Sequence, residues 1–357
     1  MTKIAGAGIS GLSCAAKLSE SQEVTVFEKS KDLGAKFGQS VFAVRAYNTQ
    51  KDFNEELKEI GFKNVSLYPI YTSKKFSPSL NCQTLKSKKP LFYNVLRGKS
   101  SESIEANLYE RCKNNGVEFI FGKAADFEDV DVIATGARDV KITGLGEAPY
   151  SRVGSGTAGD YPCKFGYGAN FVDASIENNT IYIFYDMNYA PQGYLYVAPF
   201  KESVTIASVG FDVSKFKEMP KIFGKALKEN KILSEIIDGA TELSHFSYIS
   251  DYFLPKTAII KGKYYIGEAA GFGEASKGFG FRYALLSGYF AANSILEKYD
   301  YDQLWKNSFL QELKEGLKAR SMIQKMTNQD YESLIAIYKN IDNLQDYMKK
   351  KSRIFNL

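Results

Sequence analysis

The chain begins with a short apolar segment that leads directly into a Gly-x-Gly-x-x-Gly motif at residues 6–11. A segment rich in small residues follows at 12–18, and residues 23–28 alternate as a β-strand does before ending in an acid. This order of strand, glycine turn, helix and second strand is typical of a Rossmann-type βαβ unit. The motif therefore predicts an α/β fold that binds a dinucleotide at its N-terminus.

Each glycine of the motif has a physical role. Gly6 permits the tight turn, Gly8 lets the backbone approach a pyrophosphate, and Gly11 lets the helix pack closely on the sheet. The helix N-terminus offers free N–H groups and the positive end of its dipole to the phosphates. Glu28 is placed to accept hydrogen bonds from both ribose hydroxyls, and its charge disfavours a 2′-phosphate. The alternative is a glycine-rich turn in an unrelated α/β protein.

The bulk composition argues against several other classes of protein. A chain of 357 residues, 44% of them hydrophobic, is long enough for two domains or for one domain with a large insertion. The net charge of +5 is spread along the sequence, which argues against a nucleic-acid-binding protein. Four cysteines without a CxxC pair and a single histidine, His245, argue against a metal site. We expect His245 to be a structural residue.

The sequence also carries signals about location. No signal-peptide pattern precedes the first strand, and no apolar run approaches the roughly 20 residues that a membrane-spanning helix needs. We therefore expect a cytoplasmic monomer. The basic residues Lys349, Lys350, Lys351 and Arg353 are most simply a solvated helix end, and they would also suit peripheral contact with an anionic membrane.

Two later segments extend the dinucleotide site and favour FAD over NAD. Residues 129–138 read as a buried strand that ends in Thr135 and Gly136, where small residues let the chain pass close to the cofactor. Residues 263–288 read as a strand, a Gly-Glu pair, a run of small residues and a long helix behind a second glycine turn. The N-terminus of that helix can face the flavin ring and the pyrophosphate.

From Gly267 to Gly288 the sequence resembles the geranylgeranyl reductase family of FAD-dependent oxidoreductases, within the wider class of glutathione-reductase-like flavoproteins. In that class an acid after glycine contacts the ribityl chain of FAD, a role that the resemblance gives to Glu268. Related hydroxylases usually have His where this chain has Gly271. A further match at 93–98 implies that Arg97 lies near the flavin, either to stabilise its anionic reduced form or simply to pair with a carboxylate.

The resemblance continues, with departures, in the middle of the chain. Tyr194, Pro199 and Gly210 match a family strand that lines a lipid-chain cavity beside the flavin. The departures in that strand are Tyr196 for Trp, Ala198 for Phe and Ser208 for Gly. Phe37 stands where many relatives have a Cys beside the flavin, and Ala275 where they often have a Pro. These replacements leave the exact substrate open.

The predicted fold is α/β, with a Rossmann-type FAD-binding domain, an inserted antiparallel-sheet substrate domain and a C-terminal helical segment. The FAD-binding domain is expected to be discontinuous, at 1–68, 92–160 and 255–298. The substrate domain is expected at 69–91 and 161–254. Strands are predicted at 180–185, 193–199 and 203–211, followed by a helix at 214–229.

The C-terminal segment 299–357 reads as two or three amphipathic helices. Its apolar residues recur near helical spacing at Leu304, Trp305, Phe309, Leu313 and Leu317. Packing on the domain surface is the favoured interpretation, and a membrane-facing stripe is the alternative.

The candidate site residues fall into three groups. The cofactor-binding candidates are Gly6, Ala7, Gly8, Ser10, Gly11, Glu28, Lys29, Gln39, Arg97, Ala124, Thr135, Gly136, Gly267, Glu268, Gly278, Phe279 and Gly280. The substrate-lining candidates are Tyr185, Tyr194, Tyr196, Pro199 and Gly210, of which Tyr194 and Tyr196 are also the catalytic candidates, as proton donors. No metal ligand is predicted.

The resemblance implies hydride transfer from reduced flavin to an isolated C=C bond of an isoprenoid chain or a related hydrophobic molecule. The sequence has no second Rossmann motif, so ferredoxin and NAD(P)H both remain open as electron donor. Two alternatives also stay open. One is a flavin-dependent monooxygenase of the same fold, and the other is a lipid- or quinone-binding protein that holds FAD without reductase activity.

Overall fold

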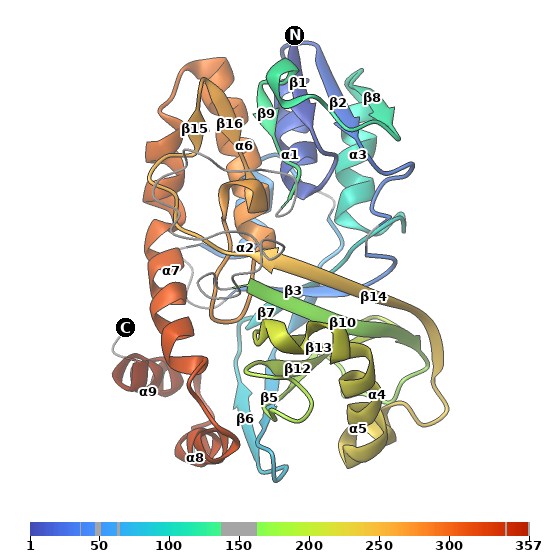
Figure 1. Ribbon diagram of the computed structural model, residues 1–357, viewed down its shortest axis with the longest axis vertical. Coiled ribbons are helices and arrows are strands. Elements are labelled where there is room, and N and C mark those ends of the chain that lie inside the picture. Colours follow the sequence, from blue (N-terminus) through green and yellow to red (C-terminus); the bar gives the residue numbers. More distant parts are fainter. Residues whose placement is uncertain (36, 47–50, 63–64, 137–162, 340, 356–357) are drawn as a thin grey trace.

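The computed structural model describes residues 1–35, 37–46, 51–62, 65–136, 163–339 and 341–355. A Rossmann-type layer forms one half of the molecule, drawn at the top of Figure 1, and a second large sheet forms the other half. The chain passes between the halves several times, because strands from the start, middle and end of the sequence share the Rossmann-type sheet.

The Rossmann-type layer is a six-stranded, mainly parallel sheet. Its strands, in spatial order, are β15 (Ile259–Ile260), β16 (Lys263–Tyr265), β9 (Val132–Ile133), β1 (Thr2–Ala5), β2 (Val24–Glu28) and β8 (Glu118–Phe121). Helix α1 (Ile9–Leu18) packs against α3 (Ile104–Asn114) and α6 (Phe281–Glu297). A Cβ on Gly288 of α6 would lie 2.2 Å from the backbone oxygen of Ser10, so only glycine allows α6 to approach α1 this closely.

The second large sheet has seven strands. Their order is β14 (Thr241–Asp251), β10 (Cys163–Val172), β13 (Ser203–Gly210), β12 (Tyr194–Phe200), β11 (Thr180–Phe184), β5 (Thr72–Phe76) and β6 (Cys82–Lys86). All neighbouring pairs are antiparallel except β11 and β5, which run parallel. The sequence prediction of an antiparallel sheet therefore needs one correction, because β5 comes from the separate segment before residue 92 and enters the sheet in the opposite sense.

The two faces of this sheet differ in what covers them. On the outer face, apolar residues such as Val197 and Ile206 pack against α4 (Met219–Glu229) and α5 (Lys231–Ile236). On the inner face, the register aligns Lys75, Ile183, Tyr196 and Ala207 across four neighbouring strands. Directly paired residues project to the same side of a sheet. The inner face is therefore the one that meets the Rossmann-type half.

A small antiparallel sheet lies between the halves, with the order β3 (Val41–Arg45), β7 (Phe92–Leu96) and β4 (Tyr68–Ile70). Strands β3 and β7 contact β12 of the large sheet. The short helix α2 (Phe53–Glu59) lies on the Rossmann side, where Phe53 contacts Phe281 of α6.

The C-terminal helices are α7 (Tyr301–Ile323), α8 (Asn328–Tyr338) and α9 (Leu344–Phe355). Helix α7 runs along the side of the molecule from one half toward the other (Figure 1). Its Trp305 and Phe309 are buried against Phe272, whereas α8 and α9 pack on β6. Packing against the domains, rather than a free apolar stripe, thus accounts for Trp305, Phe309 and Leu313, all of which are buried.

Most predicted elements are present. The strands predicted at 180–185, 193–199 and 203–211 are observed within one residue at each end. The predicted helix at 214–229 starts instead as a 3₁₀ turn, η2 (Val213–Glu218), before α4 begins. Strand β4 crosses the predicted boundary at residue 68, and the boundary at residue 160 falls outside the described residues. Within the described part of the chain, no helix is long and apolar enough to span a membrane.

Candidate functional site

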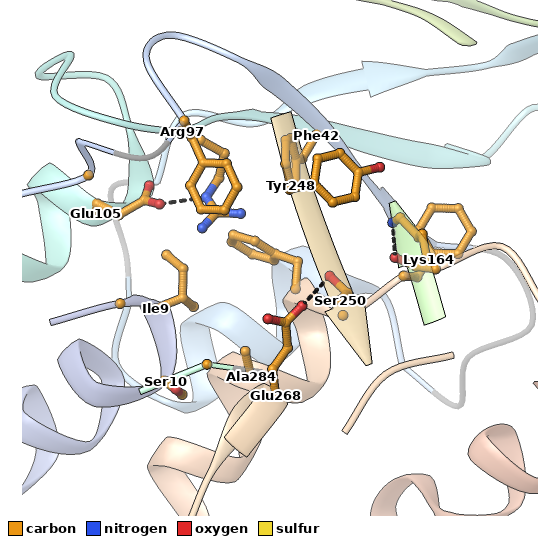
Figure 2. A pocket seen from close by; sticks show the side chains of 18 of the residues that line it. Ile9, Ser10, Phe42, Arg97, Glu105, Lys164, Tyr248, Ser250, Glu268 and Ala284 are labelled. Atoms are coloured by element: carbon orange, nitrogen blue, oxygen red, sulfur yellow. Dashed lines mark hydrogen bonds and ion pairs between the residues drawn. The ribbon is translucent and has the colours of Figure 1, made fainter. Parts of the chain in front are cut away.

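A cavity of about 510 Å³ lies between the Rossmann-type layer and the inner face of the large sheet. Figure 2 shows side chains that line it, with Ile9 and Ser10 on one side and Tyr248, Ser250 and Lys164 on the other. Of the residues predicted from sequence, the cavity wall contains Gly6, Ala7, Gly8, Ser10, Glu28, Lys29, Arg97, Ala124, Thr135, Gly136, Glu268, Gly278, Phe279, Gly280, Tyr185, Tyr194 and Tyr196. The tertiary structure therefore gathers residues from across the chain around one space.

In the glycine turn after β1, Gly6 and Gly11 are closely packed against neighbouring backbone, whereas Gly8 faces open space. Gly6 has φ +108°, and a Cβ there would lie 2.5 Å from the backbone oxygen of Ala134. A Cβ on Gly11 would lie 1.9 Å from the oxygen of Gly6. By contrast, a Cβ on Gly8 would have no described atom within 4 Å. Gly8 thus leaves a cradle at the helix N-terminus that a phosphate can fill.

Glu28 is positioned by backbone donors. One carboxylate oxygen accepts the N–H of Ala7 at 2.9 Å, and the other accepts the N–H of Ser30 at 2.8 Å. A carboxylate oxygen has two lone pairs, so each oxygen keeps capacity for a ligand hydroxyl. Lys29 and Ala124 line the same end of the cavity.

Thr135, Gly136 and Glu268 line the cavity next to this turn. Thr135 Oγ1 is buried and has no hydrogen-bond partner among the described residues. Gly136 has φ +77°, and a Cβ there would lie 3.7 Å from Glu268 Oε2. Glu268 Oε1 accepts the Ser250 hydroxyl at 2.7 Å, as the dashed line in Figure 2 shows. An orphaned hydroxyl, an open glycine cradle and two oriented carboxylates together fit the phosphate and hydroxyl groups of FAD.

Arg97 follows β7 and lies among aromatic rings. Its Nε donates to Glu105 Oε1 at 2.5 Å (Figure 2), and its guanidinium carbon lies 4.4 Å from the Phe37 ring centroid and 4.9 Å from that of Phe42. Of the two roles open for Arg97, pairing with a carboxylate is therefore present in the structure. Glu105 Oε2 is buried without a partner in the described part of the chain, so this oxygen can still accept a hydrogen bond from a ligand.

Lys164 was missed by the sequence analysis. Its ammonium donates to the Gly278 oxygen at 2.8 Å and lies 4.8 Å from the Tyr248 ring centroid. Burial lowers the pKa of Lys164 to about 8, although Glu268 and Glu274 oppose that shift. The strand register pairs Lys164 with Ser250, which brings both to the Glu268 side of the cavity. The one available signal was a lysine in a strand otherwise rich in glycine and aromatic residues.

The predicted catalytic tyrosines lie on β12 at the cavity wall. The Tyr194 hydroxyl donates to the backbone oxygen of Lys277, so its proton is already engaged. Burial raises the pKa of both Tyr194 and Tyr196 above the ordinary range. Both phenols therefore stay protonated at neutral pH, as a proton donor must.

Several predicted residues lie outside the cavity wall. Gln39 is exposed, and Gly11 and Gly267 serve close packing, since a Cβ on Gly267 would lie 2.7 Å from Ser10 Oγ. The Pro199 oxygen accepts the Asn94 side-chain amide at 2.7 Å, and Gly210 makes room for the Phe165 ring. Pro199 and Gly210 alternate along their strands with the residues that face the cavity. They therefore face the other side of the sheet and do not line the cavity.

His245 is also placed away from the cavity. It lies on β14 with Nε2 2.6 Å from Glu242 Oε1, and its side chain is 45% exposed. A surface pair of this kind is consistent with the structural role expected from the sequence.

Residues 4–48 match the family described as NAD(P)-binding Rossmann-like domain. An uncharacterized protein of Methanocaldococcus jannaschii is 26% identical over 207 residues, which are 53% of this chain and 48% of that protein. The chain thus spans about half the length of the curated relative that it matches.

Solved structures with similar folds cover nearly the whole chain. A geranylgeranyl bacteriochlorophyll reductase-like protein of Thermoplasma acidophilum matches with TM-score 0.73 and 14% identity, over 96% of this chain and 92% of that one. The p-nitrophenol 4-monooxygenase of Pseudomonas putida matches with TM-score 0.67 and 11% identity, over 99% and 97%. A myxobacterial FAD-dependent chondrochloren halogenase matches with TM-score 0.58 and 13% identity, over 95% and 90%.

These comparisons establish the fold. The likeness to the Thermoplasma protein supports the resemblance that the motifs indicated. The Rossmann-like match and the flavin-dependent proteins of the same fold support FAD as the cofactor of this cavity. The chain therefore has the α/β fold of flavin-dependent oxidoreductases.

Proposed function

We propose that the protein is an FAD-dependent oxidoreductase that reduces C=C bonds of an isoprenoid-type chain. One observation carries the proposal, namely that a single cavity joins the glycine turn at Gly6–Ser10 to the apolar inner face of the large sheet. A cofactor held at one end would therefore share its space with a hydrophobic ligand at the other.

The chain's own residues suit the binding of the cofactor. The Gly8 cradle would receive the pyrophosphate, Glu28 a ribose and Glu268 the ribityl hydroxyls. The unpartnered Thr135 hydroxyl would gain an acceptor there. When bound, FAD supplies the hydride chemistry, and the protein supplies position and electrostatics.

The opposite wall suits a hydrocarbon chain. Leu85 of β6 and Ile181 and Ile183 of β11, the two strands that flank β5, line it together with Phe92. Burying apolar ligand surface there would contribute roughly 25 cal/mol per Å². The same side chains would exclude water from the reacting bond.

Reduction of a C=C bond also requires a proton. Tyr196 holds a protonated phenol at the cavity wall, and its raised pKa keeps that proton in place at neutral pH. Lys164 is a second source, because a pKa near 8 leaves it charged but acidic enough to give up a proton. We propose one of these two groups as the donor, with Tyr194 occupied by the Lys277 carbonyl.

The test is a single-turnover experiment. The purified protein would be loaded with FAD, reduced with dithionite under argon and mixed with a geranylgeranyl lipid. Reoxidation of the flavin by the lipid, with a saturated product in the mass spectrum, is the expected result. Bound FAD that remains reduced in the presence of the lipid would contradict the reductase function and leave the lipid- or quinone-binding protein as the better explanation.

The fold likeness to a p-nitrophenol 4-monooxygenase favours a second candidate. A monooxygenase would consume O₂ in step with NAD(P)H and hydroxylate its substrate. Oxygen uptake that depends on both NAD(P)H and an added aromatic substrate would favour it. The electron donor of the reductase, ferredoxin or NAD(P)H, can be assigned by the same assay run with each donor under argon.

A further inference from the structure

The order of binding groups along the cavity indicates which residues lie next to the flavin ring. FAD is a linear molecule, in which adenosine, pyrophosphate, ribityl chain and flavin ring follow one another. Glu28, the Gly8 cradle and Glu268 suit the first three of these groups. The ring is therefore expected beside the residues that continue the cavity wall from Glu268.

Lys164 and Gly278 continue this wall from Glu268. The Ser250 hydroxyl donates to Glu268 Oε1 at 2.7 Å, and Ser250 pairs with Lys164 in the register of β14 and β10. The Lys164 ammonium donates to the Gly278 oxygen at 2.8 Å (Figure 2), and both residues line the cavity. A Cβ on Gly278 would lie 2.4 Å from Lys164 Nζ, so glycine is needed for this close contact. The fold thus holds a cation at one defined place in the wall.

The other cations of the described cavity wall are placed differently. They are Lys29, Lys75, Arg97 and Lys277. Arg97 forms an ion pair with Glu105 at 2.5 Å, which offsets its charge. Lys29 lies at the nucleotide end, and the remaining two also line an adjoining cavity of about 70 Å³ next to the C-terminal helices. Of these cations, Lys164 is the one beside the expected position of the ring.

Titratable groups from several elements face Lys164. The carboxylates of Glu268, in η3 (Gly267–Ala270), and of Glu274, in the turn before α6, both favour its charged form. Burial outweighs them and lowers the pKa of Lys164 to about 8. The phenols of this region, which burial keeps protonated by raising their pKa, are Tyr194, Tyr248 and Tyr252. Lys164 is therefore the described group here that can gain or lose a proton near neutral pH.

Reduction of FAD changes the charge next to this lysine. On reduction, FAD takes up two electrons and one proton, so the flavin gains one negative charge. A negative charge within about 4–6 Å of an ammonium group favours its protonated form. Lys164 therefore binds its proton more tightly when the flavin is reduced. The coupling is reciprocal, so the proton on Lys164 also makes the flavin easier to reduce.

We infer that Lys164 is the residue whose protonation is coupled to reduction of the bound flavin. Two electrons from a low-potential donor and one proton reduce FAD, and a second proton from solvent converts the neutral amine of Lys164 to its ammonium form. The reduced site then holds the two electrons and two protons that reduction of one C=C bond consumes. This inference deepens the proposed function and rests on it for the use made of the second proton.

The test counts protons taken up with the electrons. The midpoint potential of FAD in the loaded protein would be measured under argon from about pH 6 to 9.5, with dithionite as reductant, reference dyes and no lipid present. Each proton bound with two electrons lowers the potential by about 30 mV per pH unit, because that is a tenfold change for a two-electron couple. We expect one proton below about pH 8, where Lys164 is already charged in the oxidised protein, and two protons above it.

Variants locate the second proton. Lys164→Met should take up one proton per two electrons at every pH, and its equilibrium constant for flavin reduction at pH 7 should fall about ten-fold or more. Lys164→Arg keeps the charge but does not titrate in this range, so it should reduce as readily at pH 7 and show the one-proton slope throughout. Lys228→Met removes an exposed lysine of α4 and should behave as the unchanged protein does.

The outcomes separate this inference from the proposed function. A one-proton slope across the whole pH range in the unchanged protein would overturn it, and so would a two-proton slope that persists in Lys164→Met. A change of slope that is present in the unchanged protein and absent from both Lys164 variants supports it, even if no lipid is reduced and the reductase proposal fails. FAD content, measured by absorption on the same samples, excludes loss of cofactor as the cause.

Discussion

The ammonium of Lys164 donates to the backbone oxygen of Gly278 at 2.8 Å and so ties β10 of the large sheet to the glycine turn before α6. The contact is close, since a Cβ on Gly278 would lie 2.2 Å from Lys164 Cδ, and Gly278 has φ +74°. Two segments from opposite halves of the molecule therefore meet through a buried cation at the cavity wall.

The lowered pKa of Lys164 predicts that the stability of the protein depends on pH. Its pKa falls from 10.5 to about 8 on folding, so the folded state binds fewer protons between these values. The destabilising effect is absent above the unfolded pKa, grows as the pH falls and is complete below about 8. Replacing Lys164 with Met removes this effect. The free energy of unfolding of Lys164→Met, minus that of the unchanged protein, should be larger at pH 7 than at pH 10, so the variant gains relative stability at the lower pH.

Urea denaturation at the two pH values measures this difference. The exposed Lys228 of α4 offers a matched control, because Lys228→Met removes a lysine from a solvated position. A relative stability of Lys164→Met that stays the same at both pH values would show that the folded protein does not perturb Lys164.

The glycine turn predicts opposite behaviour for two neighbouring substitutions. Gly8→Ala places its methyl group in open space and should leave the unfolding temperature of the FAD-free protein unchanged, while FAD binding weakens about ten-fold or more. Gly11→Ala forces a methyl group against the Gly6 oxygen and should destabilise the fold by about 1–3 kcal/mol or more. Thermal unfolding without FAD and flavin-fluorescence titration check the two effects. Normal FAD affinity in Gly8→Ala would argue against phosphate binding at this turn.

The buried pair of Arg97 and Glu105 predicts a large loss of stability when one partner is removed. Arg97→Met leaves the Glu105 carboxylate uncompensated and should cost about 3–5 kcal/mol in the free energy of unfolding. Adding Glu105→Leu to that variant should recover most of the loss, because both charges are then gone. The exposed pair of Lys51 and Glu59 is the control, and Lys51→Met should cost less than about 1 kcal/mol. An additive double variant would mean that the pair is not coupled.

The two candidate proton donors predict different kinetics. If Tyr196 donates the proton, Tyr196→Phe should lower the single-turnover rate of lipid reduction by about 10²- to 10⁴-fold with little change in lipid binding. If Lys164 donates it, Tyr196→Phe should retain its rate, and the rate of the unchanged protein should fall as the pH rises above about 8. Stopped-flow flavin absorbance across pH 6–10 distinguishes the two. Tyr194→Phe is the matched control, since its hydroxyl is engaged by Lys277.

Local patterns were enough to predict much of this protein. The glycine motif, the strand that ends at Glu28 and the segment at Gly267–Gly280 each carry their information within a few residues. Steric requirements at Gly6 and Gly11, and strand alternation at 180–210, depend only on the backbone geometry of those segments. For that reason the Rossmann-type unit, the inserted sheet and the C-terminal helices could all be read from the sequence.

The residues that sequence reasoning missed depend on contacts between distant segments. Lys164 and Gly278 are 114 residues apart, and Lys75 and Tyr347 are 272 apart. A lysine in a strand gives no sign of whether it will be partly exposed and paired with a carboxylate, like Lys74, or buried in a cavity, like Lys75, because alternation alone does not say which face is covered.

The sequence by itself thus determined the fold class and the nucleotide-binding turn, because those follow from short-range sterics and periodicity. The tertiary structure alone decided which side chains share the cavity with the glycine turn. It turned Pro199 and Gly210 away, paired Arg97 with Glu105 and brought Lys164 to Gly278. The physical reason is that burial, pairing and pKa depend on which elements pack together, and sheet register and helix packing set that over long separations in the chain.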